Sequence, residues 1–368
     1  MKNSFLCLVS AFALLLSVNL FAQDDTNAPK YSNEFLQIGV GAEALGMGNS
    51  VVASVNDVTA AYWNPAGLTQ VKDWGEVALM HSEYFAGIAK YDYLGIAHPL
   101  DKKSTIGFSA IRFGVDDIPN TTQLIDNEGR IDYDRITLFT AADYAFLFSY
   151  ARKLNIEGLS VGGNFKVIYR KAGDFAHSWG FGIDGGLQYR LNDKFQFGLM
   201  ARDVTSTFNA WVFDLDTETQ EVFLETGNEI PENGLELTLP RIILAANYKQ
   251  DLGQKGIYLS SELNFNVTTD GRRNTLIKSD VVSVDPTFGL EIGFKKFVAI
   301  RAGIGNIQQT KDFDDNLSYG LQPNIGVGLG FRRISLDYAF TDIGDVSTAL
   351  YSHVISLKFG LDKPNNAQ

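Results

Sequence analysis

The sequence predicts an all-β fold: a transmembrane antiparallel β-barrel of about fourteen strands, preceded by a small N-terminal plug. Three observations lead to this prediction. The chain opens with an export signal and later contains no apolar run of the ~20 residues that a transmembrane helix needs. Most of the chain alternates between apolar and polar residues with a period of two. Its predicted connections are also sorted by length, short on one side and mostly long on the other.

The export signal is a predicted signal peptide over residues 1–22. Lys2 supplies the positive charge, residues 5–20 form the apolar core, and Ala22 precedes a plausible cleavage site. An uncleaved anchor is the alternative, which the short apolar run and the polar residues after it disfavour. The one cysteine, Cys7, lies inside the apolar core, so we expect no disulfide and no thiolate metal site in the exported chain.

Composition narrows the class of protein further. The formal net charge of −12 argues against nucleic acid or anionic lipid as a partner. Aromatic residues make up 12% of the chain and glycines number 35, both generous for a soluble domain. An exported, aromatic and glycine-rich chain without an apolar helix is typical of an integral outer-membrane barrel, whose strands contact the membrane lipids.

Alternation of apolar and polar residues marks the strands. In 181–190, Phe181, Ile183, Leu187 and Tyr189 alternate with glycine and polar residues, and successive side chains of a strand point to opposite faces. Such segments match the ~9–11 residues of a membrane strand. We expect the barrel over 75–361 and a tail over 362–368. The predicted strands are 75–86, 90–99, 104–114, 135–150, 157–170, 177–190, 194–203, 239–249, 256–267, 285–295, 297–306, 319–331, 333–341 and 350–361.

The lengths of the connections favour a membrane barrel over a soluble sandwich. A tight turn follows every even-numbered predicted strand, whereas a long polar segment follows most odd-numbered strands. Outer-membrane barrels have short periplasmic turns and long external loops. The parity therefore predicts that both termini and the plug are periplasmic. The long loops are expected at 115–134, 204–238, 268–284, 307–318 and 342–349.

Residues 23–74 are predicted to form the periplasmic N-terminal segment and plug. Within them, 39–67 is rich in glycine and alanine, and small residues let backbone pack closely on backbone. The run Asn64-Pro65-Ala66-Gly67 should end any helix, because proline lacks the amide donor and restricts the residue before it. The residues of this plug motif are Gly46, Gly48, Trp63, Asn64, Pro65, Ala66 and Gly67.

The same stretch resembles the N-terminal signature of the PorV/PorQ family, a branch of the FadL-like outer-membrane barrels. The resemblance implies a barrel of fourteen strands with an N-terminal hatch that carries the Asn-Pro-Ala turn, here Asn64 to Ala66. The matching residues are Gly41-Ala42, Leu45-Gly46-Met47-Gly48, Val52-Ala53, Asp57, Ala60 and Trp63-Asn64-Pro65-Ala66-Gly67.

Two functions follow from this resemblance. PorV-type proteins serve the type IX secretion system of Bacteroidetes, so the first hypothesis is a non-enzymatic secretion component that binds the translocon or the C-terminal domains of secreted cargo. FadL-like proteins pass hydrophobic molecules through the barrel and out of a lateral gap. The alternative is therefore an outer-membrane transporter of hydrophobic compounds. Gly67 stands where PorV proper has lysine, which points to a paralogue with a different client.

The predicted loop 204–238 is the candidate partner-binding site. It carries eight acidic residues and no lysine or arginine, and loops beyond ~12–15 residues are usually functional or disordered. A solvated surface loop is the alternative. A calcium site at Asp214-x-Asp216-x-Glu218 is disfavoured because the rest of a ligand loop is missing. The candidate contact residues are Trp211, Phe213, Asp214, Asp216 and Phe223.

No constellation of residues predicts catalysis, a cofactor or a metal. The histidines lack metal-ligand spacing, and the neighbours His177-Ser178 and Ser352-His353 lack a third triad member. Charged residues expected on the lumen face should form interior salt bridges, with a polar permeation path as the alternative. These residues are Asp184, Arg190, Glu262, Glu291, Arg301 and Asp337.

Overall fold

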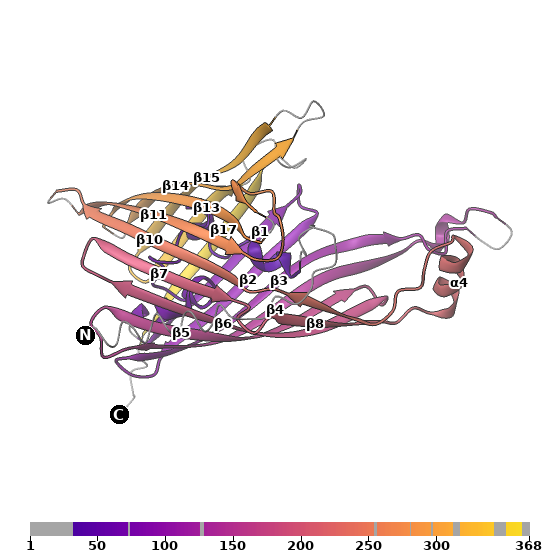
Figure 1. The fold of residues 1–368 in the computed structure, drawn as a ribbon, viewed down its shortest axis with the longest axis horizontal. Coiled ribbons are helices and arrows are strands. Elements are labelled where there is room, and N and C mark those ends of the chain that lie inside the picture. Colours follow the sequence, from indigo (N-terminus) through magenta and orange to yellow (C-terminus); the bar gives the residue numbers. More distant parts are fainter. Residues whose placement is uncertain are drawn as a thin grey trace.

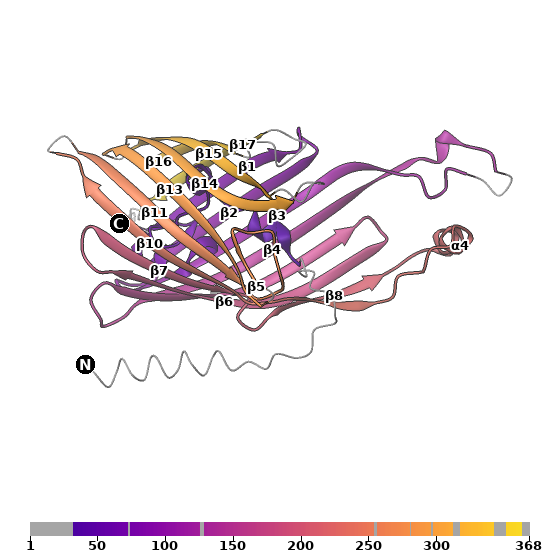
Figure 2. The ribbon, with the colours of Figure 1, turned by 45° about the horizontal axis from the view of Figure 1, so that its top comes forward.

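A computed structural model describes residues 32–72, 74–125, 129–253, 256–279, 281–295, 297–311, 317–341 and 351–362. The predicted signal peptide, most of the predicted tail and the predicted loop 342–349 lie outside these residues. The chain forms one antiparallel sheet that curls into a barrel and closes on itself (Figure 1). A second view shows the same barrel with an arm that projects beyond one end (Figure 2).

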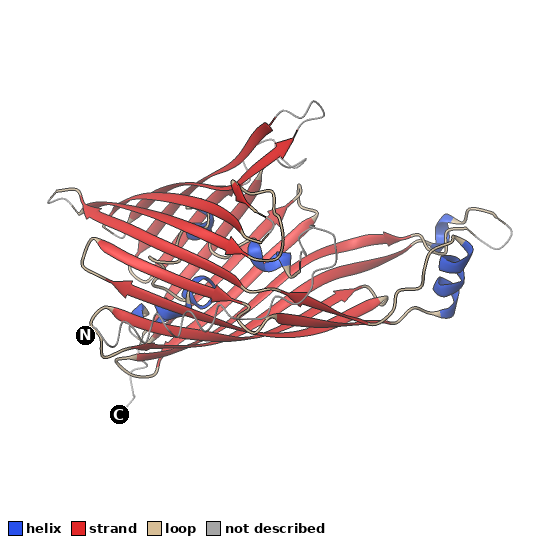
Figure 3. Ribbon diagram, in the orientation of Figure 1, coloured by secondary structure: helices blue, strands red, loops and turns tan. Residues whose placement is uncertain are grey.

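The elements of the N-terminal region are short helices, and strands make up nearly all of the rest (Figure 3). No helix in the described residues is long and apolar enough to cross a membrane. The helices are η1 (Glu34–Gln37), α2 (Ala42–Gly46), α3 (Ala60–Trp63), η2 (Pro65–Gln70), η3 (Tyr133–Arg135) and α4 (Thr217–Glu225). The strands are β1 (Gly75–Tyr84), β2 (Ala89–Pro99), β3 (Ser104–Asn120), β4 (Thr137–Lys153), β5 (Leu159–Ala172), β6 (Ala176–Arg190), β7 (Phe195–Arg202), β8 (Thr207–Phe213), β9 (Gly234–Thr238), β10 (Arg241–Asp251), β11 (Ile257–Thr268), β12 (Ile277–Lys278), β13 (Ser283–Phe294), β14 (Val298–Lys311), β15 (Leu317–Phe331), β16 (Ile334–Thr341) and β17 (Ser352–Leu361).

Fourteen of these strands form the closed ring, which confirms the predicted fold class. Each predicted strand corresponds to one strand of the ring. β17 closes the ring against β1, in a ladder that runs from Gly75↔Leu361 to Glu83↔His353. The ring order is β1-β2-β3-β4-β5-β6-β7-β10-β11-β13-β14-β15-β16-β17. The remaining strands β8, β9 and β12 are additions to the sheet at one end.

Several predicted loops are more ordered than expected. The segment 204–238 was expected as an irregular loop, but it contains β8, α4 and β9. β8 continues the barrel wall by pairing with β6, and β9 pairs with β8. The loop predicted at 115–134 is partly strand as well, because β3 and β4 keep pairing after a register shift between Val115 and Ile118. The prediction was wrong here because the ladders of β3 with β4 and of β6 with β8 continue past the length that a membrane strand needs.

The two ends of the barrel differ, as the parity of the connections predicts. We call the end with the short connections after β2, β4, β6, β10, β13 and β15 the turn end, and the opposite end the loop end. β8, α4 and β9 project from the loop end as an arm, residues 207–238 (Figures 1 and 3). β1 begins and β17 ends at the turn end.

The outer face of the ring strands is apolar. In β15, for example, Ile325, Val327, Leu329 and Phe331 are about half exposed, whereas the alternating glycines face inward against buried residues. A wall of exposed apolar side chains around a closed ring is the surface that a membrane barrel presents to lipid. The inner face is instead occupied by the chain's own N-terminal region.

Candidate functional site

The described residues from Ser32 to Trp74 lie inside the barrel, and we call them the lumenal segment. Their contacts come from strands all around the ring, including β3 to β6 and β14 to β17. The segment begins at the loop end, where the Ser32 hydroxyl lies 2.6 Å from that of Thr238. It leaves at the turn end, where the Trp74 amide donates to the Leu361 carbonyl (3.3 Å). The segment therefore traverses the lumen, in the place expected of the plug.

Glycines of the wall allow the backbone of the segment to touch the strands directly. A Cβ placed on Gly303 of β14 would lie 2.1 Å from the Gly48 nitrogen, and one placed on Gly48 would lie 2.8 Å from the Ile304 nitrogen. Gly48 also has a positive φ of 61°, which disfavours other residues. Gly46 meets Gly326 of β15 in the same way, with a built Cβ 3.0 Å from the Gly326 Cα. Two of the predicted motif glycines thus contact the wall.

The predicted Asn-Pro-Ala-Gly turn also rests on the wall. The Asn64 amide group donates to the carbonyls of Val52 and Leu187, each at 3.0 Å, and its side-chain oxygen accepts from the Ala66 amide (3.2 Å). A Cβ built on Gly162 of β5 would meet the Pro65 carbonyl carbon at 2.5 Å. The turn therefore packs directly against the backbone of two neighbouring wall strands, β5 and β6.

The rest of the motif holds the segment together. The Trp63 indole donates to the Val40 carbonyl (2.8 Å), and Gly67 packs so closely that a Cβ there would lie 2.4 Å from the Val55 oxygen. Whether the motif anchors a gate, as its sequence position suggests, stays a prediction.

Glu262 of β11 fixes the middle of the segment. Its two carboxylate oxygens accept hydrogen bonds from the successive amides of Ala53 (2.7 Å) and Ser54 (2.9 Å), and the side chain is fully buried. Charge-assisted bonds of this kind are stronger than neutral ones. One of the predicted lumen charges thus binds the segment directly.

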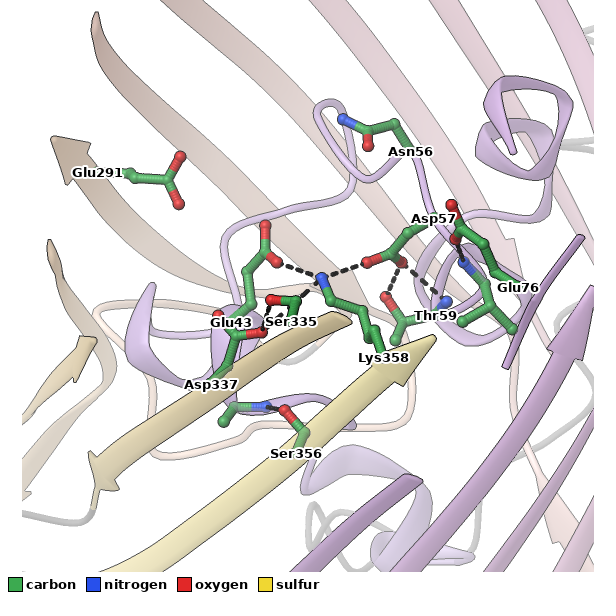
Figure 4. A network of polar contacts seen from close by, with 12 residues as sticks. Glu43, Asn56, Asp57, Thr59, Glu76, Glu291, Ser335, Asp337, Ser356 and Lys358 are labelled. Carbon is green, nitrogen blue, oxygen red and sulfur yellow. Dashed lines mark hydrogen bonds and ion pairs between the residues drawn. The ribbon is translucent and has the colours of Figure 1, made fainter. Parts of the chain in front are cut away.

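An ionic network joins the first half of the segment to the far side of the barrel (Figure 4). Lys358 of β17 lies between Glu43 (2.6 Å) and Asp57 (2.7 Å), both on the segment. Arg301 of β14 binds Asp337 of β16 (2.7 Å) and lies 3.6 Å from Glu43. Because each of these ion pairs joins one residue of the segment to one residue of the wall, the pairs fix where the segment lies across the lumen and along the barrel axis.

The acid limit of this network can be predicted from Glu43. Burial raises the pKa of this carboxyl, but Lys358 and Arg301 outweigh burial and lower the pKa from its ordinary 4.5 to about 2. Because the folded-state pKa is the lower one, Glu43 stabilises the fold fully above about pH 4.5, and this contribution is lost as the pH falls toward 2. The unfolding temperature of the protein, measured by circular dichroism, should therefore fall between about pH 4.5 and 2. In Glu43→Gln this fall should be smaller. Glu83→Gln, at an exposed carboxylate on the outer face of β1, should leave the profile unchanged.

A second ionic cluster lies nearer the loop end. The Lys166 ammonium binds Asp184 (2.8 Å) and Asp203 (2.5 Å), and its side chain is only 4% exposed. The guanidinium of Arg202 donates to the Leu36 carbonyl (3.0 Å) and the Tyr62 carbonyl (3.2 Å). Interior salt bridges, the favoured prediction for the lumen charges, are thus present at Asp184, Glu291, Arg301 and Asp337.

The segment leaves two cavities in the lumen. The loop-end cavity has a volume of about 660 Å³ and is lined by Tyr62, Trp63, Arg202, Arg241 and Asp285 among others. The turn-end cavity has a volume of about 450 Å³, and its lining includes the ionic network. Both volumes fall within the usual 300–1,000 Å³ of small-molecule sites. The lumen can therefore hold a small ligand on either side of the segment.

The predicted partner-binding residues are spread along the arm. Trp211 and Phe213 lie on β8 with stacked rings 6.2 Å apart. The Asp216 carboxylate caps α4 by accepting from the Thr219 amide (2.7 Å), and Phe223 lies within that helix. Asp214 is exposed. Glu236 of the same acidic segment is paired with Arg170 (3.2 Å). Partner binding at these residues stays a prediction.

The described residues contain no group of three histidine, cysteine, aspartate or glutamate side chains that could hold a metal ion. The neighbours His177 and Ser178 lie on one strand and point to opposite faces, as do Ser352 and His353. Neither pair can form a serine–histidine dyad.

Sequence reasoning missed residues that matter for this site. Lys358 and Glu43 were not singled out, and Asp57 was noted only as a residue that matches the family signature, although a lysine at an inward position of a strand is a usable signal. The sequence shows the wall glycines only as the small residues that alternate with apolar ones along a strand. Which glycine contacts which residue of the segment can be seen only in the structure.

Comparison with known proteins supports the barrel fold. No family model matches the sequence, and no curated protein matches it significantly. Among solved structures, the chain is similar to the CymD monoaromatic hydrocarbon channel, with 13% identity, a TM-score of 0.55, and coverage of 89% of this chain and 98% of that one. It is similar to the P. putida toluene transporter TodX (12% identity, TM-score 0.55, coverage 88% and 99%).

The toluene transporter TbuX of Ralstonia pickettii is a further similar structure, with 12% identity, a TM-score of 0.52, and coverage of 88% and 98%. None of these three is a secretion protein, so they lend no support to the PorV/PorQ branch of the resemblance. At such low identity the likeness concerns the fold alone. The chain has a closed fourteen-stranded antiparallel barrel fold that is similar to the fold of these three proteins.

Proposed function

We propose that the protein is a FadL-type channel of the outer membrane that passes small hydrophobic compounds, with the lumenal segment as its gate. The observation that carries this proposal is the division of the lumen by that segment into two cavities. The likeness in fold to transporters of aromatic hydrocarbons supports it, as does the predicted export signal. The function is non-enzymatic passage.

Passage requires the segment to move. The ring strands are hydrogen-bonded to both neighbours all the way round in the described residues, and β2 pairs with β3 without interruption from Ala89↔Val115 to Pro99↔Thr105. That ladder therefore has no break to serve as the lateral gap that the resemblance implies. We expect a compound to cross the plane of the segment, where wall and segment touch backbone to backbone.

A reversible cross-link tests this gate. The hydroxyls of Ser50 on the segment and Thr287 on β13 lie 2.8 Å apart, so the double variant Ser50→Cys/Thr287→Cys should form a disulfide without large movement. We expect the oxidised variant to reduce toluene uptake by cells that depend on this protein to near background, and a reductant to restore it.

The control is a second cross-link at a place that need not move. The hydroxyls of Thr69 and Ser160 lie 3.0 Å apart, near the point where the segment joins β1. Thr69→Cys/Ser160→Cys should leave uptake close to that of the unmodified protein. Unchanged uptake with the first cross-link fully formed would refute the gate, and absence of any uptake by the unmodified protein would refute the channel.

A secretion component is the second candidate, and the projecting arm is the observation that favours it. Seven of its acidic side chains are exposed beyond the barrel, from Asp214 to Glu232, on a surface that a transport function does not use. Purification in mild detergent with identification of bound proteins tests this candidate. Recovery of the barrel without a translocon component or secreted cargo would refute the secretion hypothesis.

A further inference from the structure

The loop-end cavity has two chemically different walls. On the side of β1 and β3 it is lined by Tyr84, Phe85 and Phe113, and the segment adds the rings of Tyr62 and Trp63. On the side of β7 to β13 the lining is polar, with Arg202, Arg241, Thr268 and Asp285. These two groups of strands lie on opposite sides of the ring. The cavity is therefore amphipathic across its width, which a bare hydrocarbon would not exploit.

Arg241 supplies an available positive charge in this cavity. Its side chain makes no hydrogen bond or ion pair within the part of the chain that the structure describes, although the carboxylates of Glu34, Asp270 and Asp285 are near enough to act on its charge. Its neighbours are also cationic: Arg202 is its ladder partner, and Arg273 lines the same cavity. Arg273 is already bound to Asp270 (2.5 Å) and Glu34 (3.4 Å), and Arg202 binds backbone carbonyls. An anionic group beside Arg241 would meet a guanidinium that no carboxylate of the described residues binds.

Several residues that line the cavity carry a buried polar atom without a partner in the described structure. These atoms are Oδ1 of Asp285, Oγ1 of Thr268 and Nε of Arg202 on the polar wall, and Oδ1 of Asn49 on the lumenal segment. A buried polar atom without a hydrogen bond destabilises the fold, so native structures rarely leave several together. Oδ1 of Asp285 and Oδ1 of Asn49 are acceptors, so the missing partner must include a donor.

We propose that the loop-end cavity binds a small aromatic acid that also carries a hydroxyl or amino donor. The carboxylate meets Arg241, the donor meets Asp285, and the ring packs against the aromatic wall, where ring pairs add to the area they bury. This inference rests on the proposed channel function and narrows its substrate. It distinguishes the cavity from one for unsubstituted hydrocarbons and from one for simple fatty acids, which lack the donor.

Calorimetric titration of the purified protein in detergent tests the proposal. The probes are 4-hydroxybenzoate, benzoate, which lacks the donor, and 4-methylphenol, which lacks the charge. We expect 4-hydroxybenzoate to bind about tenfold more tightly than either, as the loss of one charged or buried hydrogen bond implies. Equal affinities for all three would overturn the proposal.

Two variants assign the contacts. Arg241→Gln should weaken both acids about tenfold and leave 4-methylphenol unchanged. Asp285→Ala should remove the preference for 4-hydroxybenzoate over benzoate. Arg190→Gln, at an arginine of the turn-end cavity, is the matched control and should change none of the affinities. Heat-modifiable gel migration confirms that each variant is folded, and a folded Arg241→Gln that binds both acids as before would overturn the assignment.

The outcomes separate this inference from the proposed function. Toluene uptake without any preference for the hydroxylated acid leaves the channel intact and removes the inference. Selective binding without uptake of any compound leaves a binding site and removes the channel.

Discussion

Replacing Lys358 by methionine should release the lumenal segment and lower the free energy of unfolding by about 3 kcal/mol. The ammonium of Lys358 is the cation shared by Glu43 and Asp57, and it also lies 4.0 Å from Asp337. The side chain of Asp57 is 16% exposed and that of Glu43 is 40% exposed, so removing the ammonium leaves chiefly Asp57 desolvated without compensation. Such a loss costs more than the pair itself contributes. Arg301 keeps Asp337 neutralised but lies 3.6 Å from Glu43, and within the described residues it forms no ion pair with Asp57.

Two measurements check this expectation. Urea unfolding in detergent should show the loss of stability, and planar bilayers should show new conductance as the segment loosens. Lys249→Met is the matched control, since Lys249 lines the same cavity but lies 4.3 Å over the Tyr258 ring. It should change stability by less than about 1 kcal/mol.

A compensating variant separates lost charge pairing from lost packing. In the Lys358→Met background, Glu43→Gln and Asp57→Asn together remove the two carboxylates left without a cation, and most of the lost stability should return. If stability stays low and the bilayer conductance stays high, the methylene groups of Lys358 hold the segment and the ionic network does not.

The ring strands could be predicted from the sequence because each has one face on the membrane side and one on the lumen. That constraint repeats along every strand, so alternation reveals it locally. The arm could not be predicted in the same way. β8 lies beyond the ring with one face partly buried, β9 is exposed or half-buried along its whole length, and Asp214 to Glu232 carry the composition of a solvated loop. Their order comes from pairing with β6, a contact that composition does not encode.

The site was harder to predict than the wall. The contacts that hold the segment join residues far apart in the chain, such as Glu43 with Lys358 and Ser54 with Glu262. No local pattern specifies which inward position meets which residue of the segment. The Asn64 motif was found because its own residues are unusual, whereas Gly162 and Gly186, which receive it, look like any glycine of a strand.

Those two glycines give the second large effect: the double variant Gly162→Ala/Gly186→Ala should expel the Asn-Pro-Ala turn and leave the barrel folded. A Cβ on Gly186 would lie 2.1 Å from the Asn64 side-chain oxygen, and one on Gly162 would lie 2.5 Å from the Pro65 carbonyl carbon. Neither contact is with the end of a long side chain that could bend away. Overpacking of this kind costs about 1–3 kcal/mol at each site.

The cost should fall on the segment and spare the ring. Alanine fits a strand at least as well as glycine, whose backbone freedom weakens strands, so the ladders of β5 and β6 have no reason to break. Gly185 is the matched control because it is the next residue of β6 on the opposite face, and a Cβ there meets nothing within 4 Å. Gly185→Ala and the double variant therefore differ mainly in which side of the wall receives the methyl group.

Maleimide labelling reads out the displacement, because the exported chain is predicted to contain no cysteine. Thr69→Cys places a thiol at a buried position three residues after Ala66, whose carbonyl accepts a hydrogen bond from the Thr69 hydroxyl. The thiol should react slowly in the Gly185→Ala background and at least tenfold faster in the double variant. Fast labelling together with retained heat-modifiable migration would show that the two methyl groups displace the lumenal segment while the barrel stays folded. Slow labelling in a folded double variant would mean that the turn tolerates both methyl groups, and that the wall glycines do not position it.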